Sequence, residues 1–195
     1  DYVRVTLFVA PFTVLIPPNN LYNLSILNIP VDDTHTMFYF VAWSPREEGG
    51  IEQDEWRAFC GAQPGVDLDA QFRHRRNRDN GYLQDRQAMR AGDFTGMRGI
   101  PVQDMAMWET MGAIADRSSE RLGASDVAIV EFRKLMVDAV RRHANGEPAI
   151  GTAGRRPPYV TLQSFEGIVP KGSDWTTLGA TADTSALATE TMPNG

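Results

Sequence analysis

The sequence predicts an α+β fold, in which an antiparallel sheet comes first and a long helix lies across it. Apolar residues alternate with other side chains along residues 2–9, which is the two-residue period of a β-strand. Residues 101–117 and 125–144 instead contain few helix breakers. Strands early in a chain and long helices later are typical of a helix layer packed on a sheet, and such a layer often encloses an apolar cavity.

Further strands are expected after the first, over residues 12–16, 21–29 and 35–43. Pro11 interrupts the first strand, and the prolines of Pro17-Pro18-Asn19 force a turn. The last two strands are rich in aromatic and branched side chains, and the short turn Asp32-Asp33-Thr34 lies between them. We therefore expect these two strands to form a hairpin.

Helices are expected over residues 54–61, 83–91, 101–117 and 125–144. Gly92 should stop the second helix, and Pro101 suits the first turn of the third. Ser125 is a good N-cap for the fourth helix, which should end at Asn145-Gly146. Residues 152–195 show no sustained period and are rich in Pro, Thr, Ala and Gly, so we expect an extended C-terminal tail.

Composition excludes several classes of function. The formal net charge of −6 argues against a nucleic-acid-binding protein, which usually needs a broad basic surface. No apolar run approaches the roughly 20 residues of a membrane-spanning helix. A single cysteine, Cys60, cannot form an internal disulfide or a cysteine metal cage, so a reducing, cytoplasmic environment is expected.

Asp104 stands out on the predicted third helix. At roughly 100° per residue, it shares one stripe with Trp108, Met111 and Ala115, so the periodicity predicts a carboxylate on an apolar face. Burying an ionised carboxylate is costly unless donors or a cation compensate it. Two interpretations stay open. In the commoner situation, Asp104 is a first-turn acid or the partner of an arginine. In the other, it is a metal ligand.

Several motifs resemble the C-terminal signature of the phthalate dioxygenase group of Rieske-type non-haem iron oxygenases. The central one is Arg98-Gly99-Ile100-Pro101-Val102-Gln103-Asp104, followed by Trp108-Glu109-Thr110-Met111-Gly112 and Ile114-Ala115-Asp116-Arg117. Others in the same order are Pro30-Val31-Asp32-Asp33-Thr34, Arg76-Asn77-Arg78-Asp79-Asn80 and Phe94-Thr95-Gly96. The resemblance spans about residues 2–151.

The resemblance implies a START-like helix-grip fold, present here as a partial domain. Residues 1–151 would form the C-terminal part of the catalytic domain, with 152–195 as its tail, and the N-terminal Rieske domain is expected to be absent from this chain. In this family two histidines and one aspartate hold the catalytic iron, the facial triad of non-haem Fe(II) oxygenases. The family's aspartate follows the glutamine of the helix motif, which here makes Asp104 the metal ligand.

The family resemblance also implies an activity. The oxygenase component would use O₂ to hydroxylate an aromatic, phthalate-like substrate, with electrons from a flavin and iron–sulfur reductase passing through a Rieske [2Fe-2S] cluster to mononuclear Fe(II). A homotrimer or hexamer is expected. Phe94, Ile100 and Trp108 are candidate pocket walls, although ordinary core packing would also explain them. Arg4 is a candidate partner for a substrate carboxylate, although a solvent-facing strand arginine is the commoner case.

The chain departs from the family pattern in its histidines. The two histidine ligands belong to an Asp-x2-His-x4-His motif, and the three histidines here, His35, His74 and His143, do not form it. We therefore expect a piece of a longer protein that is inactive by itself. Two alternatives remain, a non-catalytic helix-grip module that binds an apolar ligand and a purely structural fragment. The lone carboxylate argues against the first, because an apolar cavity gains nothing from it.

Overall fold

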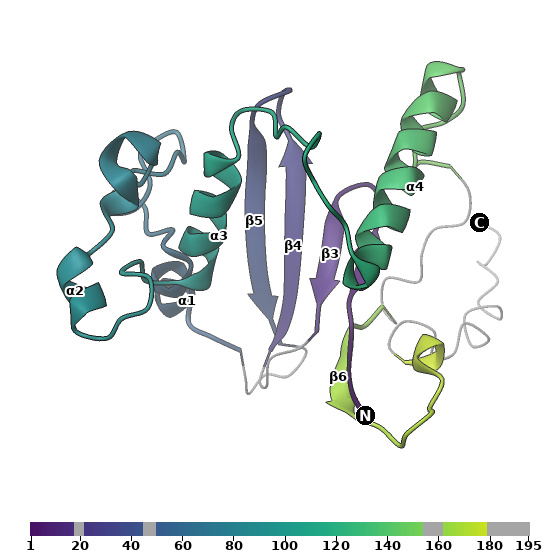
Figure 1. The fold of residues 1–195 in the computed structure, drawn as a ribbon, viewed down its shortest axis with the longest axis horizontal. Coiled ribbons are helices and arrows are strands. Elements are labelled where there is room, and N and C mark those ends of the chain that lie inside the picture. Colours follow the sequence, from purple (N-terminus) through teal and green to yellow (C-terminus); the bar gives the residue numbers. More distant parts are fainter. Residues whose placement is uncertain (18–21, 45–49, 154–161, 179–195) are drawn as a thin grey trace, which may run out of the picture. The chain divides into compact units, whose positions relative to one another are not determined.

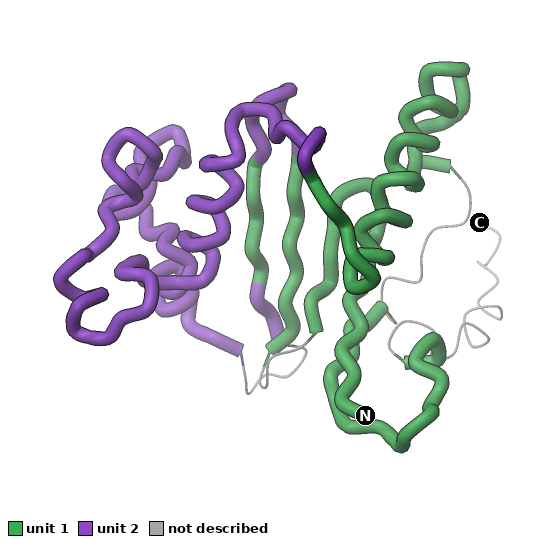
Figure 2. The backbone as a smooth tube through the Cα atoms, in the orientation of Figure 1, with its two compact units in different colours: residues 1–29, 37–41, 120–195 green, residues 30–36, 42–119 purple. Residues whose placement is uncertain are grey.

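The computed structural model describes residues 1–17, 22–44, 50–153 and 162–178, and the chain divides into two compact units. The first unit comprises residues 1–29, 37–41 and 120–195, and the second comprises 30–36 and 42–119 (Figures 1 and 2). Most of the predicted turn at 17–19 lies outside the described residues. Each unit is described by itself below.

The early strands form two antiparallel arrangements. Strands β2 (Leu7–Val9), β3 (Thr13–Ile16), β4 (Asn23–Pro30) and β5 (Thr36–Trp43) form a four-stranded sheet in that order. Strand β1 (Tyr2–Val5) pairs instead with β6 (Phe165–Ile168), from Tyr2 opposite Ile168 to Val5 opposite Phe165. The predicted strands at residues 12–16, 21–29 and 35–43 and the hairpin are therefore confirmed. The predicted first strand, residues 2–9, is instead divided at Thr6 into β1 and β2, which belong to different sheets. Strand β6 was not predicted, because four residues in a segment rich in turn formers carry no recognisable period.

The long helix of the first unit is α4 (Val127–Ala144), as expected from the sequence (Figure 1). Phe132 on α4 meets Phe8 on β2 edge-on, with 4.9 Å between the ring centroids. Asn145 follows as the C-cap and Gly146 has a φ of 88°, which confirms the predicted end. The predicted start is wrong, because a 3-10 turn, η2 (Ala124–Asp126), precedes the helix and Asp126 rather than Ser125 takes the N-cap position.

The second unit contains the remaining helices, which are α1 (Gln53–Cys60), η1 (Arg78–Leu83), α2 (Arg86–Arg90) and α3 (Ile100–Thr110). Helix α1 agrees with the prediction. The second predicted helix is shorter than expected, because Tyr82 and Leu83 have positive φ and Asp85 caps a new helix. The third ends at Thr110 rather than residue 117, because Gly112 has a φ of 93° and turns the chain out of the helix.

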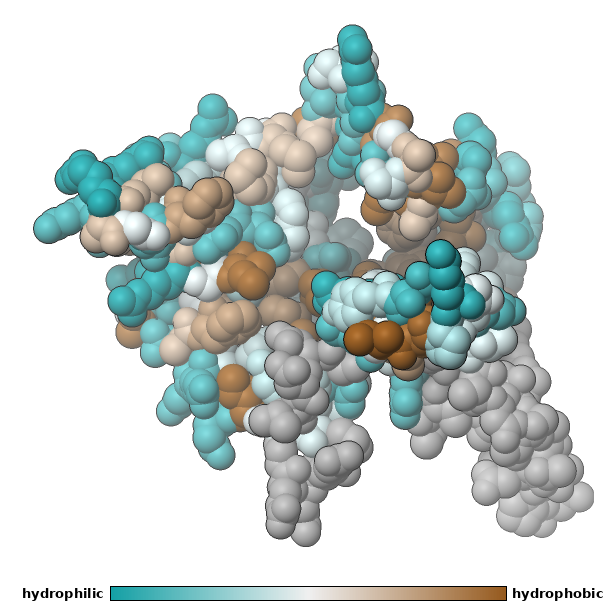
Figure 3. Space-filling model, turned by 60° about the horizontal axis from the view of Figure 1, so that its bottom comes forward, coloured by the Kyte–Doolittle hydropathy of each residue, from teal (hydrophilic) through white to brown (hydrophobic). Residues whose placement is uncertain are grey.

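Antiparallel strands together with these helices confirm the α+β class, as the helix-grip resemblance requires. That α3 covers the sheet stays a prediction. Few side chains of the described residues are buried, and the apolar ones include Leu24 in the first unit and Cys60, Val102 and Ala106 in the second. Figure 3 shows apolar groups open among hydrophilic ones on the face that it draws. No helix in the described ranges combines the length and hydropathy that a membrane crossing requires.

The turn before β5 depends on one carboxylate. Oδ1 of Asp32 accepts hydrogen bonds from the backbone N–H groups of Thr34 and His35, each at 2.8 Å. The Thr34 N–H, followed by the His35 side chain, lowers the pKa of Asp32 to about 2. These bonds explain why Asp32-Asp33-Thr34 turns the chain here.

A depressed carboxyl pKa predicts a loss of stability in acid. The ordinary pKa of Asp is 3.8, so the stabilisation is complete above that pH and is lost as the pH falls through about 2. We expect Asp32→Asn, which keeps the acceptor oxygen but cannot titrate, to flatten the pH dependence of urea unfolding in this window. Asp33→Asn is the matched control, because Asp33 accepts none of these bonds from the described residues. An unchanged slope in Asp32→Asn would contradict the assignment.

Candidate functional site

Helix α3 carries the predicted metal ligand. Gly99 precedes the helix and Pro101 lies in its first turn. The N–H groups of the first turn have no partner within the helix, so the missing N–H of proline costs no hydrogen bond there. Asp104 comes after that turn, and the first turn of α3 contains no acid. The first-turn interpretation of Asp104 is therefore wrong.

The predicted burial of Asp104 is also wrong, since its side chain is exposed. Helix α3 buries Pro101, Val102 and Ala106 instead. The helix is apolar on both sides, so a helical wheel could not say which side is covered within the chain. The Asp104 carboxylate makes no hydrogen bond or ion pair with any residue that the structure describes. An exposed, unpaired carboxylate oxygen is a suitable donor for Fe(II), so this residue fits one position of the predicted triad.

The predicted substrate-contacting residues are mostly open to solvent. Phe94 is 94% exposed, and Ile100 and Trp108 are exposed at 62% and 42%. Arg4 lies on β1 opposite Glu166, and its Nε is 3.7 Å from the Glu166 carboxylate. The ordinary strand ion pair thus accounts for Arg4 as observed. The roles of these four residues toward a substrate stay predictions.

The histidines lie in separate surroundings. The Nδ1 of His35 is 2.9 Å from the Asp32 carboxylate, and the Nδ1 of His143 is 3.0 Å from the Glu147 carbonyl oxygen. His74 is half-buried in the second unit. Within the described ranges, no three His, Cys, Asp or Glu side chains gather closely enough to hold a metal. Burial raises the pKa of Cys60 to about 12, which keeps its thiol protonated and unreactive.

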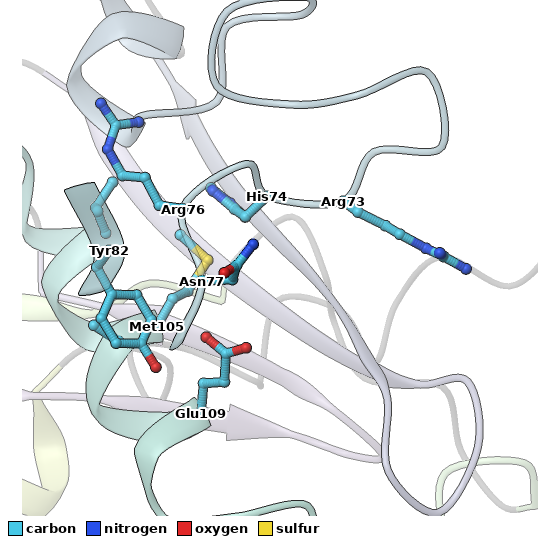
Figure 4. Close-up of a pocket in the computed structure, with 9 residues that line it drawn as sticks. Arg73, His74, Arg76, Asn77, Tyr82, Met105 and Glu109 are labelled. Carbon is cyan, nitrogen blue, oxygen red and sulfur yellow. The ribbon is translucent and has the colours of Figure 1, made fainter. Parts of the chain in front are cut away.

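A pocket of about 270 Å³ lies within the second unit, and we call it the Tyr82 pocket. Its lining residues are Arg73, His74, Arg76, Asn77, Tyr82, Val102, Met105, Ala106 and Glu109 (Figure 4). The sequence analysis did not predict this pocket. The close spacing of Arg73, His74 and Arg76 gave no sign that helix α3 lies against them.

A buried ion pair holds the loop of the Tyr82 pocket. Asp67, whose side chain is 6% exposed, pairs with Arg76 and also accepts a hydrogen bond of 3.0 Å from the Gln63 N–H. The side chain of Asn77 accepts bonds from the N–H groups of Asp79 and Asn80 and so caps η1. These contacts order the segment that carries His74 and Tyr82, and η1 in this segment lies against α3.

We expect Asp67→Ala to lower the free energy of unfolding by about 2 kcal/mol, because it leaves a partly buried guanidinium and the Gln63 N–H without their acceptor. Asp67→Asn, which can still accept from Gln63, should cost roughly half as much. The control is Glu131→Ala. It removes an exposed ion pair with Lys134, whose two side chains are each 63% exposed, and should change stability by less than about 0.5 kcal/mol. Urea unfolding of the three variants measures the difference, and equal losses for Asp67→Ala and Glu131→Ala would contradict it.

Comparisons with known proteins agree with the motif on α3. A family model described as "LigXa C-terminal domain like" matches residues 1–194. The chain is 55% identical over 175 residues to the phthalate 4,5-dioxygenase oxygenase subunit of Pseudomonas putida, covering 90% of this chain and 39% of that protein. It is 32% identical over 195 residues to the 3-chlorobenzoate-3,4-dioxygenase oxygenase subunit of Comamonas testosteroni, covering 90% and 44%. The chain therefore spans about two fifths of the length of these curated relatives. The resemblance inferred from the sequence motifs is confirmed.

Proposed function

The chain belongs to the LigXa C-terminal domain-like family, and on that premise we propose that it forms part of the oxygenase component of a Rieske-type aromatic-ring dioxygenase. The proposed reaction is the O₂-dependent hydroxylation of a phthalate-like aromatic acid, with electrons from a reductase. The identity of 55% to a phthalate 4,5-dioxygenase oxygenase subunit favours this substrate class. A homotrimer or hexamer in the cytoplasm is part of the same proposal.

The observation that carries the proposal is the carboxylate of Asp104. It follows Gln103 on α3, as the family's iron ligand does, and neither a helix terminus nor a described cation accounts for it. Asp104 would hold mononuclear Fe(II) together with two histidines from the remainder of the protein. When bound, the iron supplies the redox chemistry that activates O₂. A Rieske [2Fe-2S] cluster would be held by a separate N-terminal domain.

The side chains around Asp104 suit an aromatic substrate. Met107, Trp108 and Met111 are exposed on α3, and they would provide an apolar surface beside the carboxylate once the remainder of the protein covers them. Excluding water from this surface would orient the ring and protect the reaction from side products. The negative charge of Asp104 is expected to offset part of the metal charge.

Supplying the intact protein with a reductase, phthalate and O₂ tests the proposal directly. We expect O₂ consumption and a hydroxylated ring product in matching amounts. The alternative helix-grip module would bind the aromatic acid without consuming O₂ or changing it. Replacing phthalate by 3-chlorobenzoate under the same conditions compares the two substrate classes that the relatives' names suggest. Binding without turnover of either acid would overturn the proposed function.

A further inference from the structure

The Tyr82 pocket lies on a different side of α3 from Asp104. At roughly 100° per residue, Met105 and Glu109 are displaced by about 100° and 140° around the helix from Asp104. The pocket also lies entirely within the second unit, between residues 73–82 and α3. It is therefore separate from the proposed iron-facing side of the helix, and nothing in the proposed function uses it.

The size and walls of the pocket suit one small ring. Its volume of about 270 Å³ is near the lower end of the range for small-molecule sites, which is roughly 300–1,000 Å³. Val102 and Ala106 are buried, and Met105 is half-buried beside them. Together with the Tyr82 ring, these side chains provide apolar contacts on the α3 side (Figure 4).

Polar groups without partners face this apolar surface. The Tyr82 hydroxyl is buried and makes no hydrogen bond of ordinary geometry with the described residues, although the Glu109 carboxylate is close enough to interact with it and raise its pKa. Figure 4 shows the hydroxyl and this carboxylate turned toward each other. The half-buried His74 ring likewise makes no hydrogen bond with the described residues. Buried polar groups are normally satisfied, so these groups favour a ligand or ordered water in the pocket.

The protonation of these groups is defined by their surroundings. Burial, followed by Glu109, raises the pKa of Tyr82, so its hydroxyl is a neutral donor at pH 7. Burial is also the main cause that lowers the pKa of His74, which is therefore neutral at this pH. Tyr82 has a φ of 58°, which is uncommon for a residue with a Cβ, and its side chain lines the pocket together with residues of α3.

The charged and polar groups around the pocket favour a neutral ligand over an ionised one. Arg76 is neutralised by Asp67, and the Arg73 side chain extends away from the other labelled groups (Figure 4). The Glu109 carboxylate is then the charge that faces the Tyr82 hydroxyl in the pocket, and it would repel a ligand that carries a carboxylate. An ammonium group cannot accept a bond from the Tyr82 hydroxyl. A neutral hydroxyl group can donate to Glu109 and accept from Tyr82, so it matches both.

We propose that the Tyr82 pocket is a binding site for a small neutral ring compound that carries a hydroxyl group, as phenols do. The ring contacts Val102, Met105 and Ala106, and the hydroxyl lies between Tyr82 and Glu109. The site is independent of Asp104 and of the iron chemistry. If the protein showed no oxygenase activity, the proposal of this binding site would be unaffected. If the site bound no phenol, the proposed oxygenase activity would be unaffected.

Crystals of the intact protein soaked with 4-bromophenol locate the site, because the anomalous signal of bromine identifies the ligand. We expect a bromine peak beside Met105 with the phenol oxygen between Tyr82 and Glu109. Parallel soaks with 4-bromobenzoate and 4-bromobenzylamine should leave the pocket without a bromine peak. A phenol peak only elsewhere, or preferential occupation by the benzoate or the amine, would overturn the proposal.

Calorimetric titration of variants at pH 7 tests the polar contacts. Tyr82→Phe should weaken 4-bromophenol binding by about fivefold to tenfold, the effect of one hydrogen bond. Glu109→Gln should weaken 4-bromophenol while strengthening 4-bromobenzoate, because it removes the repelling charge. Loss of fold alone cannot produce this opposite response. Tyr39→Phe and Glu131→Gln, matched changes at exposed positions outside the pocket, should leave both affinities unchanged. Unchanged phenol binding in Tyr82→Phe would contradict the site.

Discussion

Replacing Gly99 with alanine is expected to destabilise the protein by about 3–4 kcal/mol. Gly99 has a φ of 85°, where an L side chain is strained by roughly 1–2 kcal/mol. A Cβ at this position would also lie well inside van der Waals contact of the Phe59 carbonyl oxygen, at the end of α1. That oxygen belongs to the backbone, so a side-chain rotation cannot relieve the overlap.

The matched control is Gly65→Ala. Gly65 has a φ of 76°, close to that of Gly99, but a Cβ there would meet nothing within 4 Å. Its substitution should cost about 1 kcal/mol from backbone strain alone. The difference between the two variants in urea unfolding therefore isolates the close approach of α1 to the start of α3. Equal losses for Gly65→Ala and Gly99→Ala would show that this approach is not tight in solution.

Local patterns show what the sequence could predict. Alternation from Tyr2 to Val9 correctly predicted extended chain, because a strand exposes its two faces to different environments and the pattern is local. It gave no sign of the break at Thr6 that puts β1 and β2 in different sheets. Helix ends were predicted less well. Leu83 adopts a φ of 51° that no property of leucine signals, so the helix predicted from residue 83 begins only at Arg86. Asp85, two residues later, was the available sign of a new N-cap.

Contacts between distant residues could not be predicted. Strand β6 pairs with β1 across more than 160 residues, and the Tyr2 hydroxyl donates to Glu166 in that pair. Tyr82 and Glu109 meet in one pocket although 27 positions separate them, and no motif connects them. Asp104 was identified because a family motif contains it. Its exposure was not predicted, because burial depends on which side of α3 the second unit covers.

Asp104→Ala in the intact protein is expected to remove the mononuclear iron. Loss of a ligand from a two-histidine, one-carboxylate site should lower metal affinity by more than about tenfold, since even losing a supporting residue outside the ligand set costs 10–100-fold. Hydroxylation of phthalate should fall by about 100-fold or more. Iron content, measured on dialysed protein, and product formation should fall together.

Because Asp104 is exposed in this chain, its substitution should affect iron binding without affecting the fold. Its carboxylate makes no hydrogen bond or ion pair with the described residues, so its removal should change the free energy of unfolding of the metal-free protein by less than about 0.5 kcal/mol. The visible spectrum of the Rieske cluster should be unchanged. Asp116→Asn is the control: Asp116 lies beyond the end of α3 and accepts a hydrogen bond of 2.9 Å from the Ser118 N–H, so iron should be retained.

Asp104→Asn separates charge from shape. The amide keeps the size of the side chain and one acceptor oxygen, but it removes the negative charge that offsets Fe(II). If the carboxylate is a ligand, Asn should lose iron nearly as completely as Ala, because a neutral amide oxygen is a much weaker donor to the cation. If Asp104 acted only through packing, Asn would retain both iron and activity while Ala would not. Normal iron and normal hydroxylation in both variants would make Asp104 an ordinary exposed acid, and the iron-ligand assignment would then be wrong.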